Sequence, residues 1–345
     1  MLDEKGLVNV IRLLVVIFII IAASASITLA LPWKFAMMAD GKANSWDDNG
    51  FGIAANTMGI LVSDIKNQSV DFVIFPGDLI VSNTPNPTIV NQQLDSWNSV
   101  MKPLYDAGIY IYAIRGNHDI SKAAFISHFP LDGNTTSPDG GFTYSFTHKN
   151  ARFFGFDQYI NRKSSFNSRV YALPSNRGQM MNGWVTAQIN NSASPLNFAF
   201  GHEPLFPSKS HPDSMANDPS SRDALVAALG NNHGAYLCGH DHIYLRGTAL
   251  DGQGHSVPEL VVGTAGGGNY DYKRINADGY TGPDSFTVDK VFGNSIKPYF
   301  GYLLVTVYQN NTWSGEFRAF RYDAYAEGLS HNAGPIQTID SFGTR

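Results

Sequence analysis

Residues that can bind metal ions or transfer protons stand at the ends of several apolar segments of this sequence. They are Asp40, Gly77-Asp78, Gly116-Asn117-His118-Asp119, Gly201-His202 and Gly239-His240-Asp241-His242. Carboxylates, an amide oxygen and imidazoles together suit ions such as Mn, Fe or Zn. A bridging carboxylate such as Asp78 can hold two ions about 3.5–4 Å apart, which is the spacing used in two-metal hydrolysis. The set therefore predicts a metal site that activates water.

Each of these motifs is weak when it is considered alone. A single aspartate such as Asp40 is typical of a turn or a helix cap, and a single histidine such as His202 is typical of an ordinary loop. Gly-Asp pairs are common, whereas Gly-Asn-His-Asp and Gly-His-Asp-His are more specific. Because all five follow successive apolar segments, they favour one common site over five unrelated loop residues.

The segments before these motifs are short and rich in β-branched and aromatic residues, which predicts strands. The predicted strands are 34–39, 71–76, 109–114, 142–146, 152–156, 196–200, 234–238, 259–262, 302–308 and 313–318. A period of 3.6 residues predicts helices over 54–66, 90–107, 183–189 and 223–229. Alternation of strand and helix implies parallel strands with helices packed outside. In such sheets, ligand sites collect at the carboxyl ends of the strands.

The fold class predicted from this pattern is α/β (α+β), with mixed sheets in a single domain over residues 31–345. The chain from residue 259 onward is mainly strand and loop and ends in a predicted hairpin around Gln309-Asn310-Asn311. Polar, glycine- and proline-rich stretches at 41–52, 203–222 and 266–298 are expected to be loops that select the substrate.

Composition excludes some classes of protein. Hydrophobic residues make up 43% of the 345 residues and aromatics 12%, which is enough for a sizeable core. The formal net charge is −5 and there is no basic run, so we expect no nucleic-acid-binding surface. The one cysteine, Cys238, cannot form an intramolecular disulfide and is expected to be a small buried residue at a strand end.

The N-terminus has the layout of a secretory signal peptide. Lys5 and Arg12 precede an apolar run over 13–21, and Ala23-Ser24-Ala25 offers a cleavage site. The alternative is an uncleaved N-terminal membrane anchor, because the apolar stretch is nearly long enough to span a bilayer. We therefore expect residues 1–30 to be one or the other and the rest of the chain to be extracytoplasmic, secreted or periplasmic. Contact with a membrane is expected only through that anchor.

Together the motifs resemble those of the calcineurin-like metallophosphoesterases, whose pattern is D-x-H, GD, GNH[DE], H and GHxH in this order. The resemblance runs from about residue 34 to residue 246. Gly-His-Glu-Pro-Leu-Phe around His202 and Gly-His-Asp-His-Ile-Tyr around His242 look most like the purple acid phosphatase branch. The resemblance implies two mixed β-sheets packed as a sandwich and flanked by helices.

The resemblance also implies a site with two divalent or trivalent metal ions, of which Fe, Mn and Zn are the expected ones. Asp40 and His242 would hold the first ion, and Asp78 would bridge both. The remaining ligands, all for the second ion, would be Asn117, His202 and His240. The family's reaction is in-line attack on phosphorus by a metal-activated hydroxide.

Four further residues receive roles from the same resemblance. His118 would lie near the leaving group and donate a proton or stabilise charge, with Asp119 as an orienting neighbour. Tyr244 and Arg246 resemble residues that follow the last motif in the acid phosphatases, and they are expected to line the substrate pocket.

The sequence departs from the family pattern at the first metal. Lys42 stands where the family has the histidine of D-x-H, and Val81 stands where purple acid phosphatases have a tyrosine. A charged ammonium cannot ligate a metal, so the first ion loses one protein ligand. Three interpretations of Lys42 stay open: it points into solvent, it contacts substrate phosphate, or it replaces the first metal in a mononuclear site. We favour a dinuclear site with an open or water-filled position.

The function expected from these residues is hydrolysis of phosphoesters, with monoesters favoured over diesters. The substrate is either a small molecule, such as a nucleotide, a sugar phosphate or a phospholipid head group, or a phosphoprotein. The alternative is a catalytically silent module that binds metal and phosphate. Lys42 and Val81, which depart from the family pattern, favour this alternative. The intact His118 argues against it, because a binding module has no need of a group beside the leaving oxygen.

Overall fold

The structure is a computed structural model that describes residues 31–44, 47–82, 86–159, 179–206, 215, 218–250, 253–269, 271, 286–294, 298–322 and 333–343. The chain divides into two compact units, Met1–Pro32 and Trp33–Arg345, and the second holds all the described helices and strands. The signal peptide or anchor expected over residues 1–30 lies outside the described residues. Within the described ranges, no helix has the length and apolar character that crossing a membrane requires.

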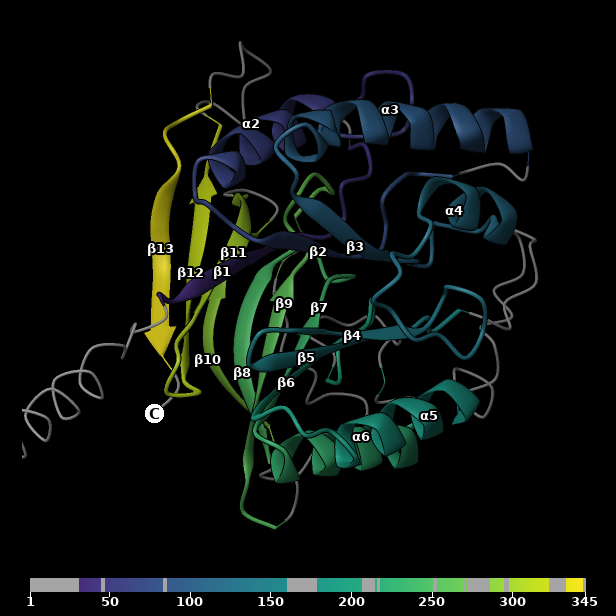
Figure 1. Ribbon diagram of the computed structural model, residues 1–345. Coiled ribbons are helices and arrows are strands. Elements are labelled where there is room, and N and C mark those ends of the chain that lie inside the picture. Colours follow the sequence, from purple (N-terminus) through teal and green to yellow (C-terminus); the bar gives the residue numbers. More distant parts are fainter. Residues whose placement is uncertain are drawn as a thin grey trace, which may run out of the picture. The chain divides into compact units, whose positions relative to one another are not determined.

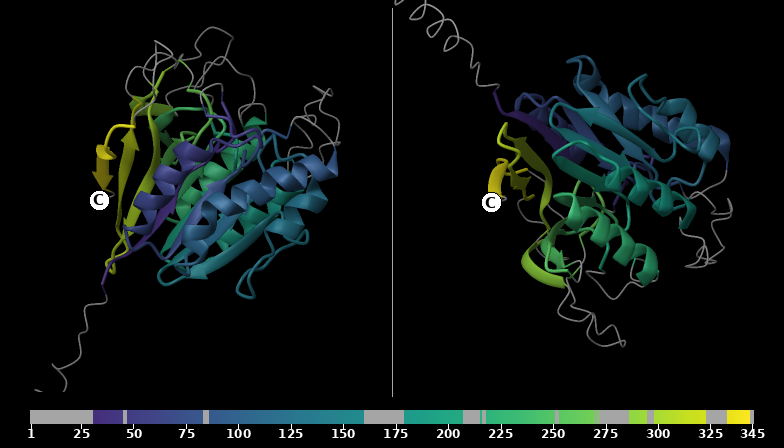
Figure 2. Two further views of the ribbon diagram at one scale, coloured as in Figure 1. Left: turned by 90° about the horizontal axis from the view of Figure 1, so that it is seen from above. Right: turned by 60° about the horizontal axis from the view of Figure 1, so that its bottom comes forward.

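Two β-sheets pack face to face in the second unit, and helices cover the outer face of each sheet (Figures 1 and 2). Among the described residues, one sheet has six strands in the order β13-β12-β11-β1-β2-β3, and the other has seven in the order β10-β8-β9-β7-β6-β5-β4. Phe35, Phe72, Phe153 and Phe198 fill the space between the sheets, with ring centroids 5.1–5.4 Å apart. The predicted sandwich of mixed sheets flanked by helices is confirmed.

The first sheet combines strands from both ends of the unit. Its strands are β1 (Trp33–Met37), β2 (Phe72–Pro76), β3 (Tyr110–Ile114), β11 (Phe300–Val307), β12 (Trp313–Phe320) and β13 (Gln337–Gly343). Its outer face is covered by α2 (Ala55–Lys66), α3 (Pro87–Tyr105) and α4 (Lys122–His128). The long helix α3 starts at Pro87 because the Asn86 side chain accepts a hydrogen bond from Thr88 N at 3.0 Å, and proline suits a first helical position.

The second sheet comes from the middle of the chain. Its strands are β4 (Tyr144–His148), β5 (Ala151–Gly155), β6 (Leu196–Phe200), β7 (Gly234–Cys238), β8 (Tyr244–Leu250), β9 (Ser256–Val262) and β10 (Phe286–Phe292). Its outer face is covered by α5 (Gln179–Asn190) and α6 (Pro219–Asn231). Cys238 is buried at the end of β7, as expected from the sequence.

Parallel strands at the centre of both sheets bring the carboxyl ends of the strands together. β1, β2 and β3 run parallel, and so do β5, β6, β7 and β9. All five residues of β2, β6 and β7 are buried, because both faces of each strand are covered. The ends of the two sheets adjoin, since Ala39 N, beyond β1, donates a hydrogen bond to Val262 O of β9 at 3.2 Å.

The predicted strands and helices correspond to β1–β7, β9, β11, β12, α2, α3, α5 and α6, with ends shifted by a few residues. The elements missed are α4, β8, β10 and β13. β10 lies in the predicted loop 266–298, because a register shift between Val288 and Lys290 breaks its alternation of apolar and polar residues. α6 starts inside the predicted loop 203–222, because Asp218 caps it through Ser221 N at 3.2 Å.

Candidate metal centre

Tight turns after β1, β2 and β7 set the directions of three predicted ligands. Asp40, Asp78 and His240 have φ angles of 62°, 53° and 68°, in the left-handed region that residues other than glycine rarely adopt. Such strained residues cluster at functional sites, where the surrounding structure holds them in place. Asp40 and Asp78 are fully buried, so each carboxylate needs a positive partner.

The turns after β2 and β3 touch each other, and glycine makes that approach possible. Gly77 has a φ angle of 89°, and a Cβ atom there would lie 2.6 Å from Gly116 N and from His202 Nδ1. A Cβ atom on Gly116 would overlap Asp78 Oδ1. The glycines before Asp78 and Asn117 therefore let two ligand-bearing turns pack at a distance that a side chain would prevent.

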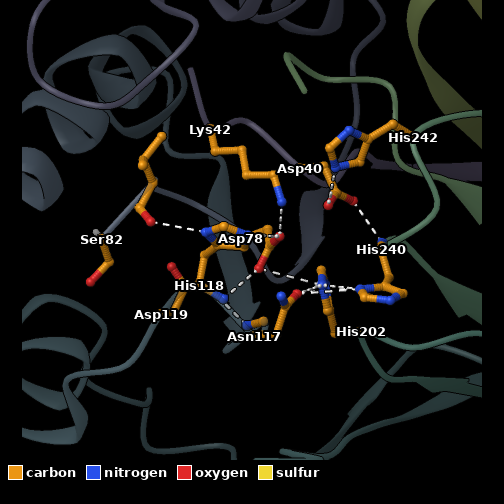
Figure 3. Close-up of polar contacts among 12 residues, drawn as sticks. Asp40, Lys42, Asp78, Ser82, Asn117, His118, Asp119, His202, His240 and His242 are labelled. Carbon is orange, nitrogen blue, oxygen red and sulfur yellow. Dashed lines mark hydrogen bonds and ion pairs between the residues drawn. The ribbon is translucent and has the colours of Figure 1, made fainter. Parts of the chain in front are cut away.

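Four donor atoms converge at the position expected for the second metal (Figure 3). Asn117 Oδ1 lies 3.0 Å from His202 Nε2 and 3.3 Å from His240 Nδ1, and the two histidine nitrogens are 3.3 Å apart. Asp78 Oδ1 lies 3.4 Å from His202 Nε2. These residues come from the ends of β2, β3, β6 and β7, so the sandwich brings together side chains that are up to 162 positions apart in the sequence.

Backbone carbonyl groups orient three of the site histidines. His202 Nδ1 donates to Pro76 O at 2.8 Å, His242 Nδ1 donates to Gly268 O at 2.8 Å, and His118 Nδ1 donates to Val81 O at 2.9 Å. Since a carbonyl oxygen only accepts, each Nδ1 carries the proton, and Nε2 faces the site. This arrangement is typical of metal-binding histidines.

At the second position the donor set fits a metal ion. His202 Nε2 and Asn117 Oδ1 are both acceptors once the His202 proton is committed to Pro76, so they repel each other at 3.0 Å unless a cation or a proton lies between them. A carboxylate, an amide oxygen and two imidazoles make a mixed nitrogen and oxygen set that suits a divalent transition ion. In the described part of the chain, a group of three acidic and histidine side chains has potential ligand atoms that all lie within 4.8 Å of one another. The three residues are Asp40, Asp78 and His202.

At the first position fewer donors are present. Asp40 Oδ2 accepts from His240 N at 2.8 Å, and Asp40 Oδ1 lies 3.3 Å from His242 Nε2. The other expected ligand atom is Asp78 Oδ2, but Lys42 Nζ donates to it at 2.5 Å. Positions 42 and 81 add a lysine and a valine, neither of which supplies a ligand. The first position therefore has an incomplete donor set.

Lys42 points into the site, so the interpretation that it points into solvent is wrong. Its side chain is 12% exposed and makes an ion pair with the fully buried Asp78 (Figure 3). The backbone around Lys42 is held by a bridge to Ile53 and by Ala54 N, which donates to Gly41 O at 2.9 Å. Residue 42 is thus fixed on the wall of the site, where the family histidine was expected.

Burial and the buried charges act against each other at this site. Burial raises the pKa of Asp78, but the Lys42 ammonium and the neighbouring histidines more than offset it and hold that pKa well below its usual range. Burial lowers the pKa of His242, and the Lys42 ammonium lowers it further. For His202, the carboxylates of Asp78 and Asp40 outweigh burial and raise the pKa. The Lys42 charge therefore affects the pKa of side chains at both metal positions.

His118 and Asp119 have different surroundings. The His118 ring is 26% exposed, and its Nε2 lies 4.0 Å from Asp78 Oδ2, so it can reach a substrate beside the metal position. Asp119 accepts from Gly116 N at 2.8 Å and from Leu79 N at 3.2 Å and ties the two turns together. Burial, and next the Asp78 charge, raises the pKa of Asp119 to about 7. The orienting partner of His118 is the Val81 carbonyl and not Asp119, which corrects the sequence prediction.

The structure does not bring Tyr244 and Arg246 to the cluster of ligands. Tyr244 is fully buried, its hydroxyl donates to Asp340 Oδ2 at 2.9 Å, and its ring stacks on Phe317. Arg246 Nε donates to the same oxygen at 2.9 Å and Nη1 to Asp289 at 3.2 Å. These contacts join β8 to β10 and β13, and they give no support to the predicted role in substrate binding.

Two features of the site were missed by sequence reasoning. The 266–268 turn after β9 carries the carbonyl that orients His242, and Gly267 N donates to Asp40 O at 2.7 Å. Behind the 116–119 turn, Arg115 donates to Asp157 Oδ2 from Nε at 2.8 Å and from Nη2 at 2.5 Å. The only sequence signals were the three glycines at 266–268 and a charged residue at the end of an apolar strand.

The chain matches the model of a known protein family. The family model described as calcineurin-like phosphoesterase matches residues 53–244, more than half of the 345 residues. The chain is a calcineurin-like phosphoesterase. The family expected from the motifs is thereby confirmed. Asp40 and Lys42 precede the matched region of this calcineurin-like phosphoesterase. A comparison with curated proteins gives no significant match.

Solved structures with the same fold include three phosphatases or related proteins. A purple acid phosphatase from yellow lupin (Lupinus luteus) seeds superposes with a TM-score of 0.60 at 16% identity, over 91% of this chain and 53% of the lupin chain. PhoD gives 0.62 at 16% identity, over 90% and 69%. A dimetal phosphatase from Danio rerio gives 0.53 at 15% identity, over 83% and 96%. The calcineurin-like phosphoesterase thus spans about half the length of the lupin enzyme, and at these identities the likeness concerns the fold.

Proposed function

We propose that this calcineurin-like phosphoesterase hydrolyses phosphomonoesters with the help of a metal ion held by Asp78, Asn117, His202 and His240. The observation that supports the proposal is the convergence of their donor atoms within 3.0–3.4 Å beside the exposed edge of His118. A buried structural ion would not need an accessible imidazole at this place. A metal ion held there would act as a Lewis acid, neutralising phosphoryl charge and lowering the pKa of water.

His118 is the residue that we assign to the leaving group. The Val81 carbonyl fixes its ring through Nδ1, which leaves Nε2 to face a bound substrate. In its protonated form, Nε2–H donates to the leaving oxygen as the ester bond breaks, and general acid catalysis of this kind contributes about 10²–10⁴-fold in rate. Asp119 keeps the two turns in register and does not touch the reacting atoms.

The charge of the site supports a preference for monoesters over diesters. A phosphomonoester carries up to two negative charges near neutral pH, whereas a diester carries one. The Lys42 ammonium lies in the centre, paired with Asp78 and only 12% exposed, and it adds a fixed positive charge next to the metal position. Because positive charge stabilises the dianion more than the monoanion, the calcineurin-like phosphoesterase is expected to prefer monoesters.

The substrate is proposed by class, as a small phosphoester or a phosphoprotein. About half of the predicted specificity loops 203–222 and 266–298 lies outside the described residues. The apolar N-terminal segment leads us to propose an extracytoplasmic location. Mass spectrometry of the mature N-terminus after expression, together with cell fractionation, checks the location; an intact Met1 in a cytoplasmic fraction would contradict it.

The test of function compares p-nitrophenyl phosphate, phenyl phosphate and bis-p-nitrophenyl phosphate as substrates. The wild type should turn over the two monoesters faster than the diester. His118→Gln should keep the bound metal but lose turnover, and it should lose more with phenyl phosphate, whose leaving group is more basic. His128→Gln is the matched control, because His128, at the end of α4, pairs with the exposed Asp95 of α3 and lies outside the site. Bound metal without any turnover would favour the silent binding module.

A further inference from the structure

The two oxygens of Asp78 face different partners. Oδ1 accepts from His118 N at 2.9 Å and lies 3.4 Å from His202 Nε2, on the side of the second metal position. Oδ2 accepts from Lys42 Nζ at 2.5 Å. With two metal ions about 3.5–4 Å apart, a bridging carboxylate can offer one oxygen to each. Lys42 therefore holds one of the two oxygens that Asp78 can offer to metal ions.

The backbone around residue 42 holds the Lys42 side chain close to Asp78 Oδ2. Residue 42 makes an isolated antiparallel bridge with Ile53, and Gly41 O accepts from Ala54 N at 2.9 Å at the start of α2. A Cβ atom on Gly41 would overlap Met58 Sδ and lie 3.1 Å from Phe75 Cζ, so the backbone between Asp40 and Lys42 lies close against these two buried side chains. Asp40 and Lys42 consequently point into the same centre (Figure 3).

Ligand number and charge both disfavour a metal ion beside this ammonium. Without Asp78 Oδ2, the first position retains Asp40 and His242 as its donors, whereas the second position has four converging donor groups. Two divalent ions together with the ammonium would set three cations against the two buried carboxylates Asp40 and Asp78. Like charges at such short range in a buried site repel strongly.

We propose that the Lys42 ammonium takes the place of the first metal ion, so that Asp78 bridges one metal ion and one ammonium group. The inference rests on the proposed function of the same site. The resident cation at the first position is then part of the chain, and its fixed charge contacts a phosphoryl oxygen of the substrate in place of a metal. Asp40 and His242 position this half of the site and do not ligate a metal.

The test counts metal ions and does not depend on turnover. The full chain and its variants are loaded with excess Mn²⁺, freed of unbound metal, and measured by inductively coupled plasma mass spectrometry and by electron paramagnetic resonance. We expect the wild type to hold about one ion with the spectrum of isolated Mn²⁺. Lys42→His should gain a second ion and show magnetic coupling between two ions, as in two-metal sites. Lys102→His, at an exposed lysine on α3, should stay at the wild-type value.

A second pair of variants separates the two halves of the site. His240→Ala should lose the bound ion, whereas His242→Ala, two residues away in the same motif, should retain about one, because under this proposal His242 binds no metal. Circular dichroism and melting curves check that both variants fold, and the gain in Lys42→His cannot arise from misfolding. If Lys42→His gains no ion, the difference in metal content between His240→Ala and His242→Ala decides whether Lys42 takes the first position.

The outcomes distinguish this inference from the proposed function. Two ions in the wild type would overturn the role of Lys42 and leave a phosphoesterase with two metals. Loss of the bound ion in both histidine variants would also overturn that role, because His242 would then ligate a metal. No bound ion and no turnover in any variant would overturn both proposals. About one ion in the wild type, kept in His242→Ala and lost in His240→Ala, supports the assignment of Lys42 to the first position.

Discussion

Replacing Arg115 by methionine removes the positive charge that faces Asp157 behind the 116–119 turn. Arg115 and Asp157 have side-chain exposures of 2% and 0%, and the guanidinium donates twice to Asp157 Oδ2. Arg115 also donates to Asp119 O at 3.4 Å and lies 5.0 Å from the centre of the Phe142 ring. Methionine keeps much of the apolar stem, so the variant chiefly tests the charge.

The expected cost is large because the remaining partner cannot reach water. Breaking a buried ion pair on one side leaves an uncompensated charge and costs about 3–5 kcal/mol. Burial already raises the pKa of Asp157 above its ordinary value, and the loss of Arg115 raises it further. A carboxyl group whose pKa is raised in the folded state does not lower the free energy of unfolding below its unfolded pKa, because it is protonated in both states. Its penalty grows as the pH rises toward the folded pKa, so Arg115→Met should cost more near pH 8 than near pH 5, as linkage requires.

Urea denaturation at the two pH values measures this cost as a change in the free energy of unfolding. Arg152→Met is the matched control, because Arg152 lies 5.2 Å from the Phe154 ring and bonds to neutral Ser145 and Gln188. It should cost no more than about 1 kcal/mol. Arg115→Met should also reduce p-nitrophenyl phosphate turnover while folded, because the turn that carries Asn117 and His118 loses its support. A cost below about 1 kcal/mol, or one that is the same at both pH values, would refute the reasoning.

Two further predictions concern a buried acid and a glycine. Burial raises the pKa of Glu259 to about 8 from 4.5, so its ionisation favours unfolding between these values. Glu259→Gln should therefore gain stability over the wild type as the pH rises, by up to about 4 kcal/mol between pH 5 and 8, and identical urea unfolding profiles would contradict this. Gly116→Ala should lose both bound metal and turnover, because its methyl group would displace Asp78. Gly133→Ala, where a Cβ atom meets nothing within 4 Å, serves as its control, and retained metal content in Gly116→Ala would show that the turns can separate.

Much of the fold followed from local patterns. Apolar five-residue strands that end in a polar motif were recognisable because both faces of β2, β6 and β7 are buried. β10 escaped recognition because its partner strand and its bulge, and not its own alternation, make it a strand. β13, which among the described strands pairs with β12 alone at the edge of its sheet, likewise depends on its neighbour.

The types of the residues that gather at the site and their order along the chain were determined by the sequence alone, because each follows an apolar strand, and the carboxyl ends of parallel strands in one sheet lie at the same edge. Which way each side chain points was decided by the tertiary structure. Lys42 reaches Asp78 across 36 positions, and Arg115 reaches Asp157 across 42, through turns whose direction no local spacing specifies. Arg246, expected at the pocket, instead pairs with Asp340 of a strand 94 positions away. Spacing along a chain fixes which residues are near in sequence, whereas the order and direction of packed strands decides which buried charges can neutralise one another.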